Sequence, residues 1–226
     1  RLNSVSTKGK RMENLDFEKR ICELTNNYEY LGLHKSEYLI WFINKVNSEK
    51  LGSYDNYDDW DALWYVLMEC YQHAENIHDA KGYLEEIMIE FFETDSVLRA
   101  VALSDKLNGV DDTKALKEIW SKGEITVYRG SHAEDRLNLS WTTDKDLATW
   151  FATRFWFPEH MMGEDYRGLP ALHTGKVYGG NVYIYTNSRD EKECLIPRPE
   201  EFIYELDKEM VDVSDKIKYF EGKERY

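Results

Sequence analysis

All four prolines of this chain lie in its second half, and this distribution constrains the fold more than any other feature of the sequence. Proline has no backbone N–H and disrupts helix interiors, so a long proline-free stretch is compatible with helices. Apolar residues in that stretch recur at the three- and four-residue spacing of a buried helix face. The clearest case comprises Trp60, Leu63, Trp64, Leu67, Cys70 and Tyr71.

The same spacing recurs elsewhere in the proline-free half. It joins Tyr38, Phe42 and Val46, then Leu84, Ile87, Met88 and Phe91, and finally Leu116, Ile119 and Trp120. Asp58 and Asp59 precede the clearest repeat, where the start of a helix favours carboxylates. We therefore expect about five or six helices between residues 14 and 121, and a helical region over 1–122.

The period changes after Gly123, where short segments rich in Val, Ile, Tyr and Thr are separated by glycine and proline. Such segments favour strands. We expect strands over 125–130, 139–143, 177–185, 193–196 and 202–206. Residues 145–155 have a helical apolar face, and Asp144 precedes them as a typical N-cap residue. The whole predicts an α+β fold, with a mainly β region over 123–226.

Composition narrows the environment and the partners. The net charge of −14 disfavours tight binding to a nucleic-acid backbone that depends on charge alone. The three cysteines, Cys22, Cys70 and Cys194, lie far apart and cannot all pair, which is typical of reduced thiols. No apolar run has membrane-spanning length, and no secretory signal pattern is present. We expect a cytoplasmic protein that makes no membrane contacts.

The first segment that carries chemistry is Val127-Tyr128-Arg129-Gly130, where an arginine ends a strand and a glycine follows. The guanidinium is a rigid, permanently charged fork suited to phosphate. Glycine allows a ligand to approach the backbone closely. By itself this pattern is more often that of a solvated arginine at the end of a strand.

The second segment is Leu139-Ser140-Trp141-Thr142-Thr143, which leads into the helix containing Trp150 and Phe151. Hydroxyls on a strand can orient a carboxylate or a ribose. The alternative is an ordinary strand followed by a capped helix.

The third segment places Glu191 and Glu193 two residues apart before Leu195-Ile196-Pro197. On an extended chain both side chains project to one face, with Cα atoms roughly 6.5–7 Å apart. Paired carboxylates suit a reaction in which one stabilises a cationic sugar and the other deprotonates the attacking group. A charged loop that leads into a strand is the alternative.

Taken in order, the three segments resemble the Arg-Ser-Glu class of ADP-ribosyltransferases, which includes bacterial toxins, vertebrate ecto-enzymes and phage-encoded modifiers. The resemblance covers about residues 123–206, and Glu-Lys-Glu-Cys-Leu-Ile-Pro is its most specific part. The middle motif reads Ser140-Trp141-Thr142 where the class usually has Ser-Thr-Ser. The resemblance implies a split β-sandwich around a cleft for NAD, with NAD as co-substrate.

The resemblance also implies a role for each catalytic residue. Glu193 would bond the 2′-hydroxyl of the nicotinamide ribose, and Ser140 would orient Glu193. Arg129 would hold a phosphate or the adenosine ribose, while the backbone of Gly130 would bond the nicotinamide amide. Glu191 would position or deprotonate the acceptor, and a glutamate at this place accompanies arginine acceptors in the class.

Further contacts to NAD are expected from Trp141, Thr142, Phe151, Arg154 and Phe155. Trp156, Phe157 and Arg167 are additional candidates, although we expect at least two of Phe155, Trp156 and Phe157 to belong to the core. The histidines show no metal-ligand spacing, so we expect no metal.

Three functions agree with these residues. The first is an NAD-dependent mono-ADP-ribosyltransferase that modifies protein arginine, as a toxin or a phage–host conflict factor that is delivered into a host cell or acts where it is made. The second is the same chemistry on RNA or DNA bases. The third is an inactive transferase fold that serves as a binding module. The helical region would dock the acceptor, bind an antidote protein or complete the fold.

Overall fold

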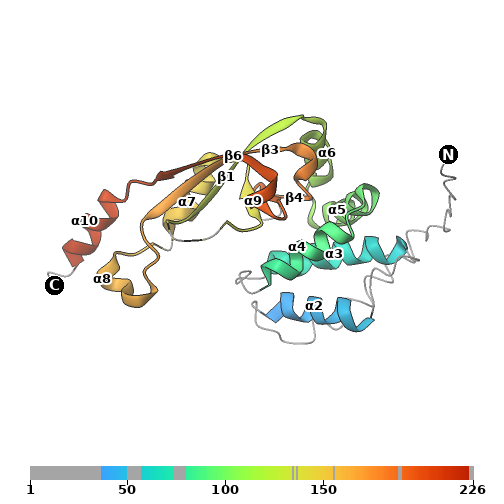
Figure 1. Ribbon diagram of the computed structural model, residues 1–226, viewed down its shortest axis with the longest axis horizontal. Helices are drawn as coiled ribbons and strands as arrows, with labels where there is room; N and C mark the ends of the chain where they lie inside the picture. Colours follow the sequence, from blue (N-terminus) through green and yellow to red (C-terminus); the bar gives the residue numbers. More distant parts are fainter. Residues whose placement is uncertain are drawn as a thin grey trace. The chain divides into compact units, whose positions relative to one another are not determined.

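The computed structural model describes residues 37–49, 57–73, 80–133, 135, 137–154, 156–187 and 190–223. The chain divides into two compact units, one that ends at Gly109 and one that begins at Val110. The described residues contain helices and one antiparallel sheet, so the predicted α+β character is confirmed (Figure 1).

The first unit consists of helices within the described residues. They are α2 (Tyr38–Glu49), α3 (Tyr57–His73), α4 (Lys81–Glu90) and α5 (Thr94–Asn108). α3 packs against both α2 and α5. The apolar face predicted for α3 is buried, since Leu63, Trp64, Leu67 and Cys70 are each at most 1% exposed. Tyr65, Val66 and Met68 are buried too, so the middle of α3 is enclosed on all sides.

Side-chain and backbone hydrogen bonds mark where these helices end. The buried Trp64 indole donates to the carbonyl of Phe91, just after α4. The Glu93 carboxylate accepts from the backbone N–H of Ser96 and caps α5. Gly109 ends α5 with a left-handed φ of 70°, a conformation that glycine adopts without a steric penalty.

Helix α6 (Asp112–Ser121) belongs to the second unit. The Trp120 indole donates to the carbonyl of Val182 at 2.7 Å. α6 also lies directly against Gly179, where an added Cβ would stand 2.1 Å from the carbonyl oxygen of Ile119. The division between the units therefore falls before α6, whereas the change of period in the sequence placed it after residue 122.

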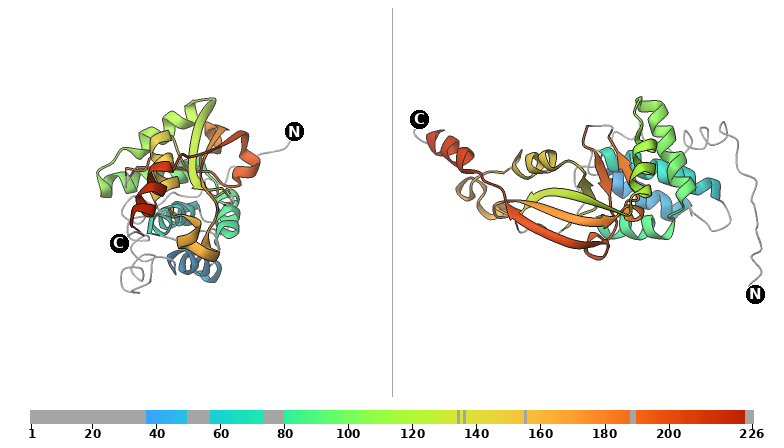
Figure 2. Two further views of the ribbon diagram at one scale, coloured as in Figure 1. Left: turned by 90° about the vertical axis from the view of Figure 1, so that its left-hand side faces the viewer. Right: turned by 90° about the horizontal axis from the view of Figure 1, so that it is seen from above.

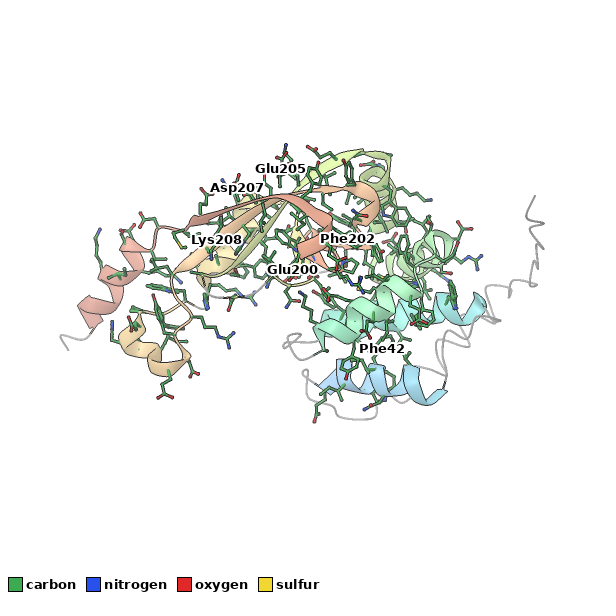
Figure 3. All side chains as sticks on the ribbon, in the orientation of Figure 1. Phe42, Glu200, Phe202, Glu205, Asp207 and Lys208 are labelled. Carbon is green, nitrogen blue, oxygen red and sulfur yellow. The ribbon has the colours of Figure 1, made fainter. Side chains whose placement is uncertain are left out.

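Six strands form one sheet in the order β4-β5-β2-β1-β3-β6, and every pairing is antiparallel. They are β1 (Glu124–His132), β2 (Ser140–Thr142), β3 (Pro170–Tyr178), β4 (Ile184–Thr186), β5 (Glu193–Leu195) and β6 (Ile203–Met210). The view from above shows β1, β3 and β6 running side by side (Figure 2). Figure 3 shows Glu205, Asp207 and Lys208 following one another along β6, the edge strand.

Among the described residues, β1 and β2 share fewer paired residues than any other two neighbouring strands of the sheet. β1 pairs with β3 along its whole length, from Glu124 to His132. Among the described residues, its pairing with β2 is a single register pair, Tyr128 with Thr142. The strands therefore fall into two groups, β4-β5-β2 and β1-β3-β6, which meet at that pair.

The strand expected over 177–185 is two strands. β3 ends at Tyr178 and β4 begins at Ile184, with a 3₁₀ turn, η3 (Gly179–Asn181), between them. Gly179 at the start of this turn lies against the end of α6, where a side chain would collide with the backbone. The pattern also missed the first residues of β3, and it missed the helices α8 (Glu159–Met162), α9 (Pro199–Phe202) and α10 (Ser214–Lys223).

Helix α7 (Lys145–Arg154) packs against β1, β2 and β3. Asp144 caps it as predicted, since Asp144 Oδ1 accepts from the backbone N–H of Leu147 at 3.1 Å. Ala148 and Ala152 form its buried side. Their small size allows the helix to approach β1 closely at Gly130.

Candidate active site

Ser140 and Glu193 meet across β2 and β5. The register sets Ser140 opposite Leu195 and Thr142 opposite Glu193. Side chains on one face recur at every second residue, so Ser140 and Glu193 are diagonal neighbours on one face. The Ser140 hydroxyl donates to Glu193 Oε1 at 2.5 Å, a length typical of a hydroxyl bonded to a carboxylate. Glu193 is only 5% exposed, so the serine orients a nearly enclosed carboxylate.

Arg129 contacts the same serine through the main chain. Its Nη1 donates to the carbonyl oxygen of Ser140 at 2.8 Å. The β1–β2 ladder stops one residue earlier, at the pair of Tyr128 with Thr142. The guanidinium thus supplies a hydrogen bond to a carbonyl just beyond the end of the ladder. Arg129, Ser140 and Glu193 are joined in sequence by hydrogen bonds, although they come from three different strands.

Glu191 lies outside β5, which begins at Glu193. Lys192, between the two glutamates, has a φ of 46°, which is left-handed. The prediction of an extended chain that sends both carboxylates to one face was therefore wrong. Glu191 is instead held through its main chain, because the Thr142 hydroxyl donates to its carbonyl oxygen at 2.9 Å.

Thr142 and Gly130, both expected to contact NAD, are engaged by protein. The Thr142 hydroxyl also accepts from the backbone N–H of Asp144 at 3.1 Å, so it joins β2 to the start of α7. An added Cβ on Gly130 would stand 1.9 Å from the carbonyl oxygen of Ala148. On that side the glycine accommodates a helix, not a ligand. A bond from its backbone to nicotinamide stays a prediction.

Trp141 lies in the core. It is 1% exposed, and its indole donates to the carbonyl of Asn138 at 2.9 Å. By the alternation along β2 it points to the face opposite that of Ser140 and Glu193, and it pairs with the buried Cys194. Trp141 is therefore placed as a core residue. This placement does not agree with the expected contact between Trp141 and NAD.

The end of α7 presents an aromatic and cationic surface. The Arg154 guanidinium lies 4.7 Å from the centroid of the Phe151 ring and 5.0 Å from that of Trp150. Trp150 is 52% exposed. Flat cationic and aromatic groups of this kind can stack on a planar ring of a ligand. Phe151 and Arg154 therefore lie together, and their contact with NAD stays a prediction, while Phe155 lies outside the described residues.

The segment after α7 divides between core and surface. Trp156 is buried, and its indole donates to the carbonyl of Gly168. Phe157 is 37% exposed. Arg167 is mostly exposed and pairs with Asp135 at 3.6 Å. Trp156 is thus a core residue, whereas Phe157 and Arg167 remain accessible to a ligand.

His173 is a buried residue beside Arg129 that the sequence pattern did not identify. The register of β3 places it opposite Arg129 on one side and Lys208 on the other. Burial, Lys208 and Arg129 together lower its pKa below its usual value, against the opposing effect of Asp135. His173 belongs to the part of β3 that lacked a clear strand pattern, so no local signal marked it.

Cys194, which follows Glu193, is fully enclosed. Burial, and then the charge of Glu193, raise the pKa of its thiol far above the usual value. Cys70 is similarly buried in α3, and burial raises the pKa of its thiol as well. Both cysteines are therefore present as neutral thiols with little nucleophilic character.

No protein-family model, curated protein or solved structure gives a significant match to the chain. Among the described residues, no cluster of three or more His, Cys, Asp or Glu side chains is arranged to hold a metal ion. None of the described helices is long and apolar enough to cross a membrane.

Proposed function

We propose that this chain is an NAD-dependent mono-ADP-ribosyltransferase with a macromolecular acceptor. The observation that carries the proposal is the hydrogen-bonded arrangement of Arg129, Ser140 and Glu193. The three residues were selected from the sequence by their resemblance to the Arg-Ser-Glu class. Arg129 and Glu193 lie 11 and 53 residues from Ser140 in the chain, and both form a hydrogen bond with it. That arrangement supports a shared role for the three residues.

The proposed reaction is a substitution at C1′ of the nicotinamide ribose. The bond from C1′ to the nicotinamide nitrogen breaks, and its electron pair leaves with neutral nicotinamide. An acceptor nitrogen forms the new bond to C1′ and loses one proton, which Glu191 accepts and passes to solvent. Water in place of the acceptor gives hydrolysis of NAD as a side reaction.

Glu193 suits the charge that develops in this reaction. The sugar becomes oxocarbenium-like as the bond breaks, and a fixed negative group near its 2′-hydroxyl stabilises that state. A carboxylate that is 5% exposed and already bonded to Ser140 needs little reorganisation to serve this purpose. Ser140 would keep the Glu193 carboxylate aligned with the 2′-hydroxyl of the ribose.

Arg129 would act through its charge. One of its N–H groups is used by the carbonyl of Ser140, and the guanidinium carries further donors on the same fork. A pyrophosphate beside this charge would be held close to the strand that carries Ser140. The narrow junction between β1 and β2 is compatible with a split sandwich around an NAD cleft.

Protein arginine is the acceptor that we favour. Glu191, two residues before Glu193, is the residue that the resemblance associates with arginine. The net charge of −14 favours a cationic guanidino group over a polyanionic nucleic acid. The corresponding biological role is that of a toxin or phage–host conflict factor, with the helical unit as the site of acceptor or antidote docking.

Labelled NAD tests the proposal directly. The full chain is incubated with labelled NAD and separate pools of lysate protein, DNA and RNA, and both released nicotinamide and labelled macromolecule are measured. We expect label in protein and its loss in the Glu193→Gln variant by about a hundredfold or more. Glu164→Gln, at an exposed position, is the matched control and should behave as the original chain.

Each contrary result has a distinct meaning. Label confined to DNA or RNA would replace arginine by a base as the acceptor. Full activity in the Glu193→Gln variant would remove Glu193 from its role. No release of nicotinamide with any pool would leave the inactive binding module as the better description.

A further inference from the structure

Backbone strain gathers around the strand that carries Glu193. Among the described residues, the non-glycine residues with positive φ are Asp190 at 58°, Lys192 at 46° and Arg198 at 45°. All three flank β5, and two of them enclose Glu191. Left-handed conformations are unfavourable for residues with a Cβ and persist only where the surroundings impose them. The backbone around Glu191 is therefore held in place by other contacts.

Lys192 itself makes three of the contacts that hold this backbone. Its backbone N–H donates to the Asn187 side-chain oxygen at 3.0 Å. Its carbonyl accepts from the backbone N–H of Thr143 at 3.4 Å. Its ammonium group pairs with Asp144 Oδ2 at 2.8 Å. Lys192 is thus attached at its N–H, its carbonyl and the end of its side chain.

The partner of the ammonium group is itself part of a rigid element. Asp144 uses Oδ1 to cap α7 at Leu147 while Oδ2 binds Lys192. α7 is fixed against β1 at Gly130. The ion pair thus ties the loop that carries Glu191 to the start of a packed helix, 48 residues away in the chain.

The other end of the loop is attached to α6, which belongs to the same unit. The backbone N–H of Asn187 donates to Asp112 Oδ2 of α6 at 2.9 Å, and Asp112 is buried. Asn187 in turn accepts from Lys192. A path of hydrogen bonds therefore runs from α6 through Asn187 and Lys192 to α7, and Glu191 lies within it.

We propose that Lys192 is a positioning residue whose pairing with Asp144 holds the left-handed turn that directs Glu191 toward the acceptor. This inference rests on the proposed transferase function and extends it to acceptor use. Without the pair, the backbone can rotate about the N–Cα bond of Lys192 toward an ordinary negative φ, which moves the peptide between Glu191 and Lys192. That rotation would redirect Glu191, whereas Glu193 stays in the β2–β5 ladder and bonded to Ser140.

Hydrolysis of NAD and transfer to the acceptor distinguish a misplaced Glu191 from a general loss of folding. Hydrolysis of NAD needs Glu193 and water, while transfer also needs Glu191 at the acceptor. Loss of the Lys192–Asp144 pair should therefore lower the ratio of transfer to hydrolysis. A general loss of folding would reduce both reactions together and leave their ratio unchanged.

The experiment uses the full chain with labelled NAD. Three acceptors are tested one at a time: an arginine-containing peptide, lysate protein and RNA. We expect Lys192→Met to lower the ratio of transfer to hydrolysis by about tenfold or more, because small misplacements of a reacting group are costly. Lys192→Arg keeps the charge and should restore the ratio. Lys145→Met is the matched control, since it breaks the exposed 3.1 Å pair of Lys145 with Glu209 at the start of the same helix.

Lys192→Gly adds an independent measurement. Glycine adopts a φ of 46° without strain, so the free energy of unfolding should be unchanged or higher. It adopts negative φ as readily, so without the ion pair nothing holds the turn and the ratio of transfer to hydrolysis falls. An unchanged ratio in Lys192→Met and Lys192→Gly, with active original chain, would overturn the positioning role alone. Absence of hydrolysis and transfer in the original chain would overturn the proposed function, and this inference with it.

Discussion

Ser140 connects two charged residues from different strands. Its carbonyl accepts from Arg129, and its hydroxyl donates to Glu193. A buried carboxylate that has lost its water needs such donors, because an unsatisfied charged group inside a protein is strongly unfavourable. The contacts of the site are therefore also contacts that stabilise the fold.

His173 allows a prediction about stability and pH. Its two ring nitrogens have no hydrogen-bond partner among the described residues, and the side chain is buried. Its pKa is lowered from the ordinary 6.5, with Lys208 and Arg129 facing it as like charges and Asp135 opposing them. The folded chain thus binds this proton less readily than the unfolded chain does. Above pH 6.5 His173 is neutral in both the folded and the unfolded chain, and its contribution to stability is fully present. That contribution is lost as the pH falls from 6.5 through the lower pKa of the folded chain.

The measurement is urea unfolding of the original chain and of His173→Leu between about pH 8 and pH 5. We expect the original chain to lose stability relative to His173→Leu as the pH falls below 6.5. Leucine cannot bind a proton, so it removes this effect without removing a hydrogen bond. Parallel stability curves over the whole range would contradict the prediction.

At the scale of secondary-structure elements, α7 and β1 meet through small residues. Gly130 on the strand faces Ala148 and Ala152 on the helix, and an added Cβ would lie 1.9 Å from one backbone atom and 2.5 Å from another. Neither neighbour is a flexible side chain that can move aside. The contact therefore sets how closely α7 approaches the sheet, and with it the position of Asp144.

We expect Gly130→Ala to lower the free energy of unfolding by about 3 kcal/mol, because α7 must shift away from β1. Thermal or urea unfolding measures this change. Gly180→Ala is the matched control, since nothing lies within 4 Å of an added Cβ there, and it should have little effect. Equal stability of the two variants would show that the helix adjusts more readily than the geometry indicates.

At the scale of the whole molecule, α6 is the element that the change of period assigned to the helical region and that the structure groups with the sheet. Its buried residues include Leu116 and Ile119, and Trp120 bonds Val182 near β4. Asp112 at its start holds Asn187, which supports Lys192. The second unit is thus incomplete without α6.

Two fragments test this division. The fragment 110–226 should fold and hydrolyse NAD, while its choice of acceptor is altered because the helical unit is absent. The fragment 123–226 should be less stable by about 3 kcal/mol or more, since it loses the buried apolar side chains of α6. Circular dichroism during urea unfolding compares them. Equal stability would return the boundary to residue 122.

Local patterns identified the helices that have a clear apolar spacing, although they missed α8, α9 and α10. The apolar spacing that begins at Trp60 identifies α3, and Asp144 caps α7 as its position before an apolar repeat indicates. The same reasoning failed over 177–185, where the strand-forming residues on either side outweighed the turn residues Gly179-Gly180-Asn181. It failed again at Lys192, because a left-handed backbone there depends on Asp144 and Asn187.

The sequence by itself determined the α+β composition, the helices that have a clear apolar spacing and the residue types at the site, because these depend on neighbours within a few positions. Only the tertiary structure decided that Ser140 meets Glu193 across 53 residues and that Arg129 reaches the carbonyl of Ser140. Strand order and register are set by hydrogen bonds between distant segments and by the burial of residues such as Trp141. Those long-range interactions leave no pattern within any one segment.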